Sequence, residues 1–537
     1  MRAEECPPAV CPASLDDPTA PAAGPGTVQS MVGGGPLRTD TLAESVLLLM
    51  AAMVLQRSIG FVREIFFCRQ LTAEELGQWD MAFSFLMLAA PLAVLSLPGT
   101  FGRYVARYRQ KGQLRQLVRR TAAFCALTAV LAALAIALAR RQLSYLVFAT
   151  PQRAGLVALL AAGLPVVVAF NYFVCLATAL KNMRLVCGIE VLSSALFAVF
   201  ALGFFCSGAA TAGSMVVAYL AACLVCVLLG LGWLARAWRG LPHCGDPAPR
   251  RELWSRLLPL AAWIMTINLL WNVFDVVGRY MIVHCWRGSP AEALAEVGNY
   301  RTARVLPLLL ASLTAFVASA ALPHWSHDWE AGRRLRVSAR VNLLLKVWAV
   351  VLSAGATVVL LAAPLLFQTL LHGKFAGGFR VLPWTLTCAI WFGLTMIAQN
   401  YLWCAERAGL ASLAALMGVA VNVGLSCLLL PRLGLLGAVL AAAAANGTAL
   451  LLVLVCSRRL GLQVHRGTTA TLLLPLAVSL GPWIALAVLA AFALEIAGSE
   501  RLWSRQEKQE VLAGAAHYLR QLRARLPRLA ASHKTGA

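Results

Sequence analysis

Apolar residues occur along this chain in long runs, separated by short polar or charged segments. Each run is about 18–25 residues long, the length with which an α-helix crosses roughly 30 Å of hydrocarbon. The runs lie at residues 42–67, 79–99, 121–139, 155–180, 185–207, 212–235, 257–283, 303–322, 341–363, 381–403, 408–430, 435–456 and 470–494. This pattern predicts an all-α polytopic membrane protein with about 12–14 transmembrane helices.

A polar, proline-containing break divides these runs into two sets of six. We expect an N-terminal six-helix lobe at 42–235, a cytoplasmic inter-lobe linker at 236–256, and a C-terminal six-helix lobe at 257–456. An additional membrane helix is expected at 470–494 and a basic C-terminal tail at 495–537. Residues 1–41 are rich in Pro, Gly and Ala and lack the apolar core of a signal peptide, so we expect a disordered N-terminal tail.

The two sets of six resemble copies of one another. Glu75-Leu-Gly-Gln-Trp79 stands near the start of the second run, and Glu296-Val-Gly-Asn-Tyr300 stands near the start of the eighth. In each half we expect that helix to end at a Leu-Pro pair, at 97–98 and 322–323, followed by a basic connection. The sequence therefore predicts two six-helix lobes related by an internal repeat, with a cavity between them.

Composition and charge fit this assignment. Hydrophobic residues make up 60% of the chain and charged residues 13%, about half the charged share of a soluble protein. Lys and Arg outnumber Asp and Glu by 46 to 23, but the excess lies in connections between runs, at 103–120, 236–256, 333–340 and 458–466. We therefore interpret the basic excess as a topology signal that places the N-terminus in the cytoplasm, and not as a nucleic-acid surface.

The side of the membrane on which the C-terminal tail lies remains open at this point. Thirteen spans would leave the tail after Glu500 on the outer side. The alternative is that 470–494 is a re-entrant or interfacial segment that returns the chain to the cytoplasm.

Motifs of catalysis are missing from the sequence. It contains no G-x-x-x-x-G-K-[ST] phosphate loop and no soluble region large enough for a nucleotide-binding domain. Most cysteines lie singly inside apolar runs, as small buried residues do. We expect a protein that is not an enzyme, with no catalytic residue, no cofactor and no metal site.

Charged and amide side chains inside the apolar runs are the candidate site, because a charge in hydrocarbon normally faces a cavity or a partner. They recur in the first two helices of each half. The candidate substrate-binding residues are Arg57, Arg63, Glu64, Asp80, Asn272, Asp275, Arg279, Arg301 and Arg304. For any single residue, neutralisation by a neighbour or an arginine reaching the interface is the alternative interpretation. As a set, they predict a shared polar cavity.

A family resemblance is carried by several parts of the sequence. They are Gln56-Arg-Ser-Ile-Gly-Phe-Val-Arg-Glu-Ile65, the two repeated motifs, Gly373-Lys-Phe375 and Leu430-Pro-Arg-Leu-Gly-Leu-Leu-Gly-Ala438. They resemble polysaccharide and oligosaccharide flippases of the multidrug/oligosaccharidyl-lipid/polysaccharide exporter superfamily. The stretch from Arg57 to Glu64 is also similar to the first helix of lipid II flippases, which implies that Arg63 and Glu64 line the central cavity. The resemblance further implies alternating access driven by an ion gradient or the membrane potential.

The expected function is therefore the flipping of a polyprenyl-diphosphate-linked oligosaccharide across a bacterial inner membrane for polysaccharide biosynthesis. The expected partners are the lipid-linked saccharide, membrane lipids, a coupling cation (H⁺ or Na⁺) and polysaccharide assembly proteins. Three alternatives stay open: a lipid II flippase, a multidrug cation antiporter of the same superfamily, and a membrane scaffold for polysaccharide assembly. An antiporter cavity should favour acidic and aromatic residues, whereas the candidate site here is rich in arginine.

Overall fold

The computed structural model describes residues 42–239, 250–369 and 373–513. The expected tail at 1–41, the middle of the linker expected at 236–256 and the end of the tail expected at 495–537 lie outside the described residues. Within the described ranges every regular element is a helix. The prediction of an all-α polytopic membrane protein is confirmed.

Six long helices of the first half correspond to the first six apolar runs. They are α1 (Leu42–Gln70), α2 (Ala73–Ala93), α4 (Leu114–Leu138), α6 (Ala154–Ala179), α7 (Met183–Cys206) and α8 (Ala212–Arg239). Shorter elements connect them: η1 (Leu97–Thr100), α3 (Phe101–Gln110), α5 (Arg140–Phe148) and η2 (Pro151–Arg153). In α3, Phe101, Val105 and Tyr108 are buried on one face and arginines lie on the other, the pattern of an interfacial amphipathic helix.

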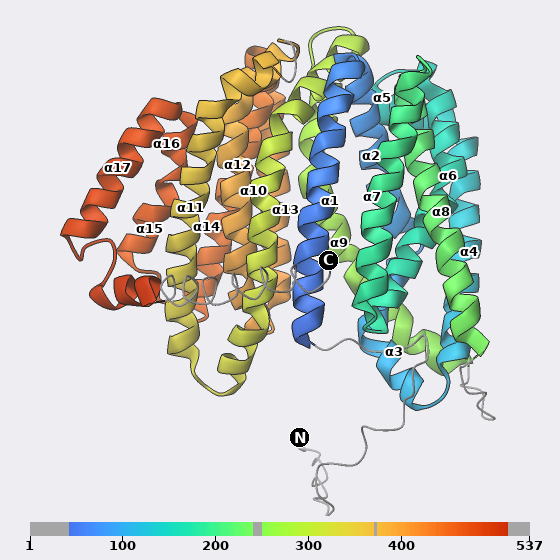
Figure 1. Ribbon diagram of the computed structural model, residues 1–537, viewed down its shortest axis with the longest axis horizontal. Helices are drawn as coiled ribbons and strands as arrows, with labels where there is room; N and C mark the ends of the chain where they lie inside the picture. The colour runs from blue at the N-terminus through green and yellow to red at the C-terminus, as the bar shows by residue number, and fades with distance from the viewer. Residues whose placement is uncertain (1–41, 240–249, 370–372, 514–537) are drawn as a thin grey trace, which may run out of the picture.

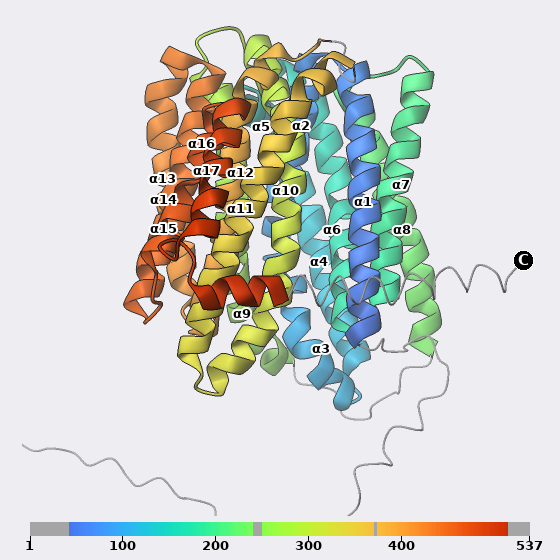
Figure 2. The same cartoon turned by 60° about the vertical axis from the view of Figure 1, so that its left-hand side comes forward.

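The second half repeats this arrangement with α9 (Arg250–Cys285), α10 (Pro290–Glu330), α11 (Arg334–Thr369), α12 (Ala376–Cys404), α13 (Ala408–Leu433) and α14 (Leu435–Arg459). Figures 1 and 2 show the two sets as lobes that stand side by side. The lobes meet where α2 packs against α9 and α10, and where α1 contacts α10. By length and composition, ten described helices could cross a membrane, or eleven if α2 and the bent segment Leu97–Gln110 are counted as one span.

The two ends of the bundle differ in charge. The end at which α3 and the loop between α10 and α11 lie, at the bottom of Figure 1, carries Arg103, Arg107, Arg333 and Arg334. We call it the basic end, and we call the end at which α1 ends and α2 begins the opposite end. The start of α9 belongs to the basic end, where the Tyr104 hydroxyl donates a hydrogen bond to the Arg256 carbonyl.

The expected ends of the two repeated helices differ in the structure. α2 ends close to Leu97-Pro98, where Leu95 and Ser96 adopt positive φ and the chain turns by 62° into η1 and α3. For α10 the expectation was wrong, because the helix continues through Pro323 to Glu330. A proline removes one helical hydrogen bond, which membrane helices tolerate, and only the first copy adds a left-handed turn that redirects the chain.

The segment after α14 contains two antiparallel arms. α15 (Arg466–Leu473) and α16 (Pro475–Ser479) form the first arm and α17 (Pro482–Gly498) the second. Gly481 between them has a φ of 118°, which favours glycine and permits the sharp reversal. The arms lie outside the C-terminal lobe and bring the chain back toward the basic end (Figure 1). The expectation of one additional membrane helix at 470–494 was therefore wrong, because the chain reverses at Gly481 inside this run.

Candidate functional site

The candidate residues come from the four helices through which the two lobes contact each other. Glu64 lies on α1, Asp80 on α2, Asp275 on α9 and Arg301 on α10. α1 and α9 are the first helices of their lobes, and α2 and α10 are the second. The internal repeat therefore brings equivalent helices of the two halves to the centre of the molecule, where their charged side chains meet.

Arg301 joins α10 to both central helices of the N-terminal lobe. Its Nη2 and Nε atoms lie 2.8 Å and 3.1 Å from the two carboxylate oxygens of Glu64. Its Nη1 donates to Asp80. The bidentate contact fixes the plane of the guanidinium group, which gives this pair both strength and a defined geometry.

Arg279 connects Asp80 to the C-terminal lobe. Its Nε lies at an ion-pair distance of 3.2 Å from Asp80, its Nη2 donates to Asp275 over 3.1 Å, and its Nη1 donates to the Ser84 hydroxyl. Asp80 and Arg279 are 5% and 9% exposed. A buried charge without a partner is very unfavourable, so these groups depend on one another.

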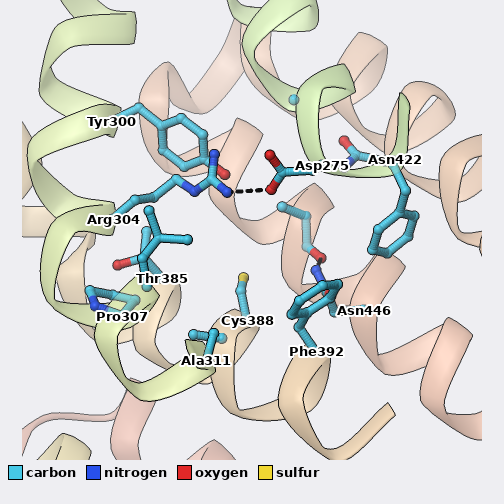
Figure 3. A pocket seen from close by; sticks show the side chains of 15 residues that line it. Asp275, Tyr300, Arg304, Pro307, Ala311, Thr385, Cys388, Phe392, Asn422 and Asn446 are labelled. Carbon is cyan, nitrogen blue, oxygen red and sulfur yellow. Dashed lines mark hydrogen bonds and ion pairs between the residues drawn. The ribbon is translucent and has the colours of Figure 1, made fainter. Parts of the chain in front are cut away.

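Arg304 is the last arginine in this series of ion pairs, on the side of the C-terminal lobe. It donates to Asp275 and its guanidinium carbon lies 5.4 Å from the centre of the Tyr300 ring. Figure 3 shows the Arg304 guanidinium and the Asp275 carboxylate pointing toward each other, in direct contact beside a cavity. The Asp275 side chain is 47% exposed although it lies deep in the bundle, because it faces this hollow.

The cavity beside Asp275 lies within the C-terminal lobe. It has a volume of about 80 Å³, and its polar lining includes Thr385, Asn422 and Asn446. A water molecule occupies about 30 Å³ of liquid, so the cavity has room for a few waters or a small cation. A saccharide is too large for it. A lipid-linked sugar therefore needs space that is formed when the lobes move apart.

Arg63 lies next to the series but has a different environment. Its guanidinium carbon lies 4.2 Å from the centre of the Phe197 ring on α7 and 5.8 Å from that of Phe67. Its Nη2 is 3.6 Å from Glu64, whose oxygens already accept from Arg301. Its Nε is buried without a hydrogen-bond partner. Arg63 is therefore held by two aromatic rings and by a carboxylate that it shares with Arg301.

Two candidates lie apart from this group. Arg57 is exposed on α1 and interacts electrostatically with Glu190 of α7. Asn272 is half-buried on α9, three residues before Asp275. The structure thus brings together seven of the nine candidates: Arg63, Glu64, Asp80, Asp275, Arg279, Arg301 and Arg304. We call these seven residues the inter-lobe charge network.

The network alternates in sign. The order Glu64, Arg301, Asp80, Arg279, Asp275, Arg304 places each carboxylate beside at least one arginine, and Arg63 adds one further positive charge. Three of these links cross from one lobe to the other: Arg301 to Glu64, Arg301 to Asp80, and Arg279 to Asp80. The carboxylates and any anionic ligand must therefore compete for the same arginines.

Some residues of the site were not among our candidates. Asn422 and Asn446 are amides inside apolar runs, so the rule that selected Asn272 also applies to them. Ser84, Tyr300 and Phe197 carry no such signal, because hydroxyls and aromatic rings are common in membrane helices. Among the described residues, no group of three or more His, Cys, Asp or Glu side chains has a geometry suited to a metal ion.

The sequence profile of the family described as polysaccharide biosynthesis protein matches residues 42–327. A comparison with curated proteins finds no match. Among solved structures, the chain is similar to the lipid II flippase MurJ in an inward closed conformation. The TM-score is 0.64 at 14% identity, over 88% of this chain and 97% of that one.

Two further structures share the fold. One is a multidrug resistance MATE transporter in an inward-facing conformation, with a TM-score of 0.56 at 14% identity over 78% of this chain and 98% of that one. The other is a transporter of the MOP superfamily from Pyrococcus furiosus, with a TM-score of 0.54 at 15% identity over 79% and 96%. At these identities the likeness establishes the fold of two helical lobes.

Proposed function

Since this chain belongs to the family of polysaccharide biosynthesis proteins, we propose that it carries a polyprenyl-diphosphate-linked oligosaccharide across the membrane by alternating access. It is a multi-pass membrane transporter of the flippase type and not an enzyme. The proposed setting is the inner membrane of a bacterium, where polysaccharide assembly proteins use the saccharide on the far side. In this setting the basic end faces the cytoplasm, where the positive-inside rule places Lys and Arg.

The observation that carries the proposal is the inter-lobe charge network. A diphosphate concentrates negative charge, and arginine is the side chain best suited to bind it with two parallel hydrogen bonds. Arg301 and Arg304 hold carboxylates in the present arrangement. A diphosphate that enters the network exchanges with these carboxylates and weakens the links between the lobes.

This competition gives the ligand a means to change conformation. A ligand shifts an equilibrium between two states only by as much as it prefers one of them. The carboxylates Glu64 and Asp80 reach Arg301 only when the lobes are together. A bound headgroup is free of that restriction, so it favours the state in which the lobes separate.

The apolar part of the substrate has a surface beside the same residues. A groove between α1, α10 and α11 is lined by Glu64 and by apolar side chains that include Phe61, Leu306 and Phe367. Within the membrane, such a groove suits an isoprenoid chain better than a sugar. A headgroup at Arg301 and a chain in this groove fit one amphiphile.

Coupling to a cation is a further part of the proposal. Asp275 is the carboxylate of the network that is most exposed, and Asn422 and Asn446 present amide groups to the same cavity. Oxygen ligands of this kind suit H⁺ or Na⁺ exchange in a space of this size. We propose that the cation binds when Asp275 is released by Arg304.

Three other functions make different demands. A lipid II flippase would use the same arginines on a related diphosphate, so substrate identity separates it from our proposal. A multidrug antiporter needs a surplus of acids for cationic drugs, whereas the network has four arginines and three carboxylates. A scaffold needs its exposed loops and does not depend on the network.

The test is depletion of the protein, followed by analysis of lipid-linked intermediates on the leaflet at the basic end. We expect a polyprenyl-diphosphate oligosaccharide to accumulate, and wild-type protein to clear it. Arg63→Ala and Arg304→Ala should fail to clear it at normal protein levels, while Arg432→Ala, an exposed arginine at the end of α13, should succeed. Lysine at position 63 or 304 should restore part of the activity if charge alone suffices. Accumulation of lipid II would favour the first alternative, and full clearance by the two alanine variants would favour the scaffold.

A further inference from the structure

The two repeated helices α2 and α10 cross in close backbone contact at the opposite end of the bundle, and Figure 2 shows them side by side. A Cβ atom added to Gly77 would lie 1.8 Å from the carbonyl oxygen of Leu294. One added to Gly298 would lie 2.1 Å from the carbonyl oxygen of Ala73. Neither position has room for a side chain unless backbone moves, so the crossing depends on both glycines.

These two contacts are copies of each other. Gly77 and Gly298 stand at equivalent positions of the repeat, and so do Ala73 and Leu294. In each lobe the glycine packs against the carbonyl one helical turn before the other lobe's glycine. The contact is therefore self-complementary in the way that a twofold interface is, although both halves belong to one chain.

A third pair of equivalent positions follows the glycines by three residues. Asp80 and Arg301 are 221 residues apart, and Arg301 donates a hydrogen bond to the Asp80 carboxylate across the crossing. Identical residues at these positions would place like charges together and push the lobes apart. The two copies have instead acquired opposite charges, so the ion pair holds the crossing closed.

The start of α10 is also fixed to its own lobe. A Cβ atom on Gly378 of α12 would lie 2.6 Å from the carbonyl oxygen of Asn299. This close approach within the C-terminal lobe means that α10 moves together with α12. Opening of the crossing is then a separation of whole lobes and not a local bend of one helix.

We propose that the crossing of Gly77 and Gly298 is the gate that closes the opposite end of the transporter, with Asp80 and Arg301 as its latch. The proposal rests on the function proposed above, because a gate matters only to a transporter. It adds that the residue which takes the diphosphate also holds the gate. Binding of the headgroup to Arg301 therefore releases the latch next to the glycine contact.

The test is a distance measurement between spin labels on the two lobes. Gln70 and Ala291 are exposed, occupy equivalent positions of the repeat, and flank the crossing. Both are changed to cysteine in an otherwise cysteine-free full-length protein in lipid nanodiscs. Gly77→Ala and Gly298→Ala should each lose most of the short-distance population, and the double variant should lose all of it.

Gly188→Ala is the matched control, since nothing lies within 4 Å of a Cβ atom at this helical glycine of α7. Alanine favours helix more than glycine at all three positions, so a change confined to positions 77 and 298 comes from the contact. An unchanged distance distribution in the Gly77→Ala, Gly298→Ala variant would overturn the gate. Distances are measured without substrate, so they report on the gate even if the transported molecule differs from our proposal.

A second measurement does not need the glycine variants, so it tests the gate even if those variants do not fold. A flexible, cleavable reagent that joins cysteines at positions 70 and 291 should stop export, and cleavage of the reagent should restore it. Undiminished export by the joined protein would show that the lobes need not separate here, and would refute the gate. If the glycine variants open while depletion leaves every lipid-linked saccharide unchanged, the gate stands and the proposed substrate is wrong.

Discussion

Glu507→Gln should release the C-terminal segment from the C-terminal lobe. Glu507 lies on a short helix at residues 505–513, and both of its carboxylate oxygens accept from Lys346 of α11, at 2.8 Å and 2.9 Å. Lys346 is 3% exposed and Glu507 18%. The only other acceptor that we find for the Lys346 ammonium in the described chain is the carbonyl of Leu502, at 3.0 Å.

The structure sets the size of the effect. Removal of one partner of a buried ion pair costs about 3–5 kcal/mol, because the other charge stays buried. Each 1.4 kcal/mol is a factor of ten, so local opening of 505–513 should become roughly 100- to 5,000-fold more frequent. The assay is amide hydrogen exchange of this segment in detergent or nanodiscs. Glu510→Gln, on the exposed side of the same helix, is the control and should change little.

A double variant separates charge from packing. Lys346→Met combined with Glu507→Gln leaves no buried charge, so protection should return to near the wild-type level. Burial alone would raise the pKa of Glu507, but the hydrogen bonds and charge of Lys346, together with the hydrogen bonds of Ser504, outweigh it and hold that pKa below its ordinary value. The pair therefore stabilises docking above the ordinary range of Glu, about pH 4, and this contribution disappears as pH falls through the lowered pKa. Exchange of Glu507→Gln equal to wild type at neutral pH would refute this reasoning.

Three further predictions concern topology, coupling and the scaffold alternative. Single cysteines at Gly112 and Gly332 should be shielded from a membrane-impermeant reagent in intact cells and one at Ala73 should react, because we propose that the basic end faces the cytoplasm. The reverse pattern would invert the topology. Asp275→Asn should remove the dependence of transport on the cation gradient while leaving headgroup binding intact. The assay is transport in vesicles with an imposed gradient, and a retained dependence would mean that another residue couples transport to the cation. Arg336→Gln, at the exposed start of α11, should leave polymer export unchanged, whereas the scaffold alternative expects a loss.

Much of the fold can be predicted from the sequence, because a membrane helix is recognised by the length and hydropathy of its apolar run. All twelve apolar runs of the two lobes correspond to long helices. The helix ends are less certain, as the two Leu-Pro pairs illustrate. Pro98 lies beside residues that adopt positive φ, and Pro323 lies within a continuous helix. A proline alone does not decide between these outcomes, because the neighbouring backbone conformation depends on tertiary contacts.

The sequence selects the seven residues of the network as candidates, but it does not predict how they pair. The cost of charge in hydrocarbon identifies Arg279 and Asp80, yet their separation of 3.2 Å depends on how α2 and α9 are rotated and crossed. Arg57 carries the same signal in the sequence and lies outside the network, since it stands about two helical turns before Glu64 along α1. Phe197 was not predictable at all, because one phenylalanine among 21 gives no sign that an arginine will lie over it.

The most direct test of the proposed mechanism is transport by the purified protein in vesicles. A polyprenyl-diphosphate oligosaccharide is placed in both leaflets, and the fraction accessible to an external sugar-modifying enzyme is followed over time. Wild-type protein should make nearly all of the substrate accessible, and the Arg63→Ala, Arg304→Ala double variant should be no faster than protein-free vesicles. Arg432→Ala should behave as wild type. A double variant that transports at the wild-type rate would contradict the central claim that these arginines carry the diphosphate across the membrane.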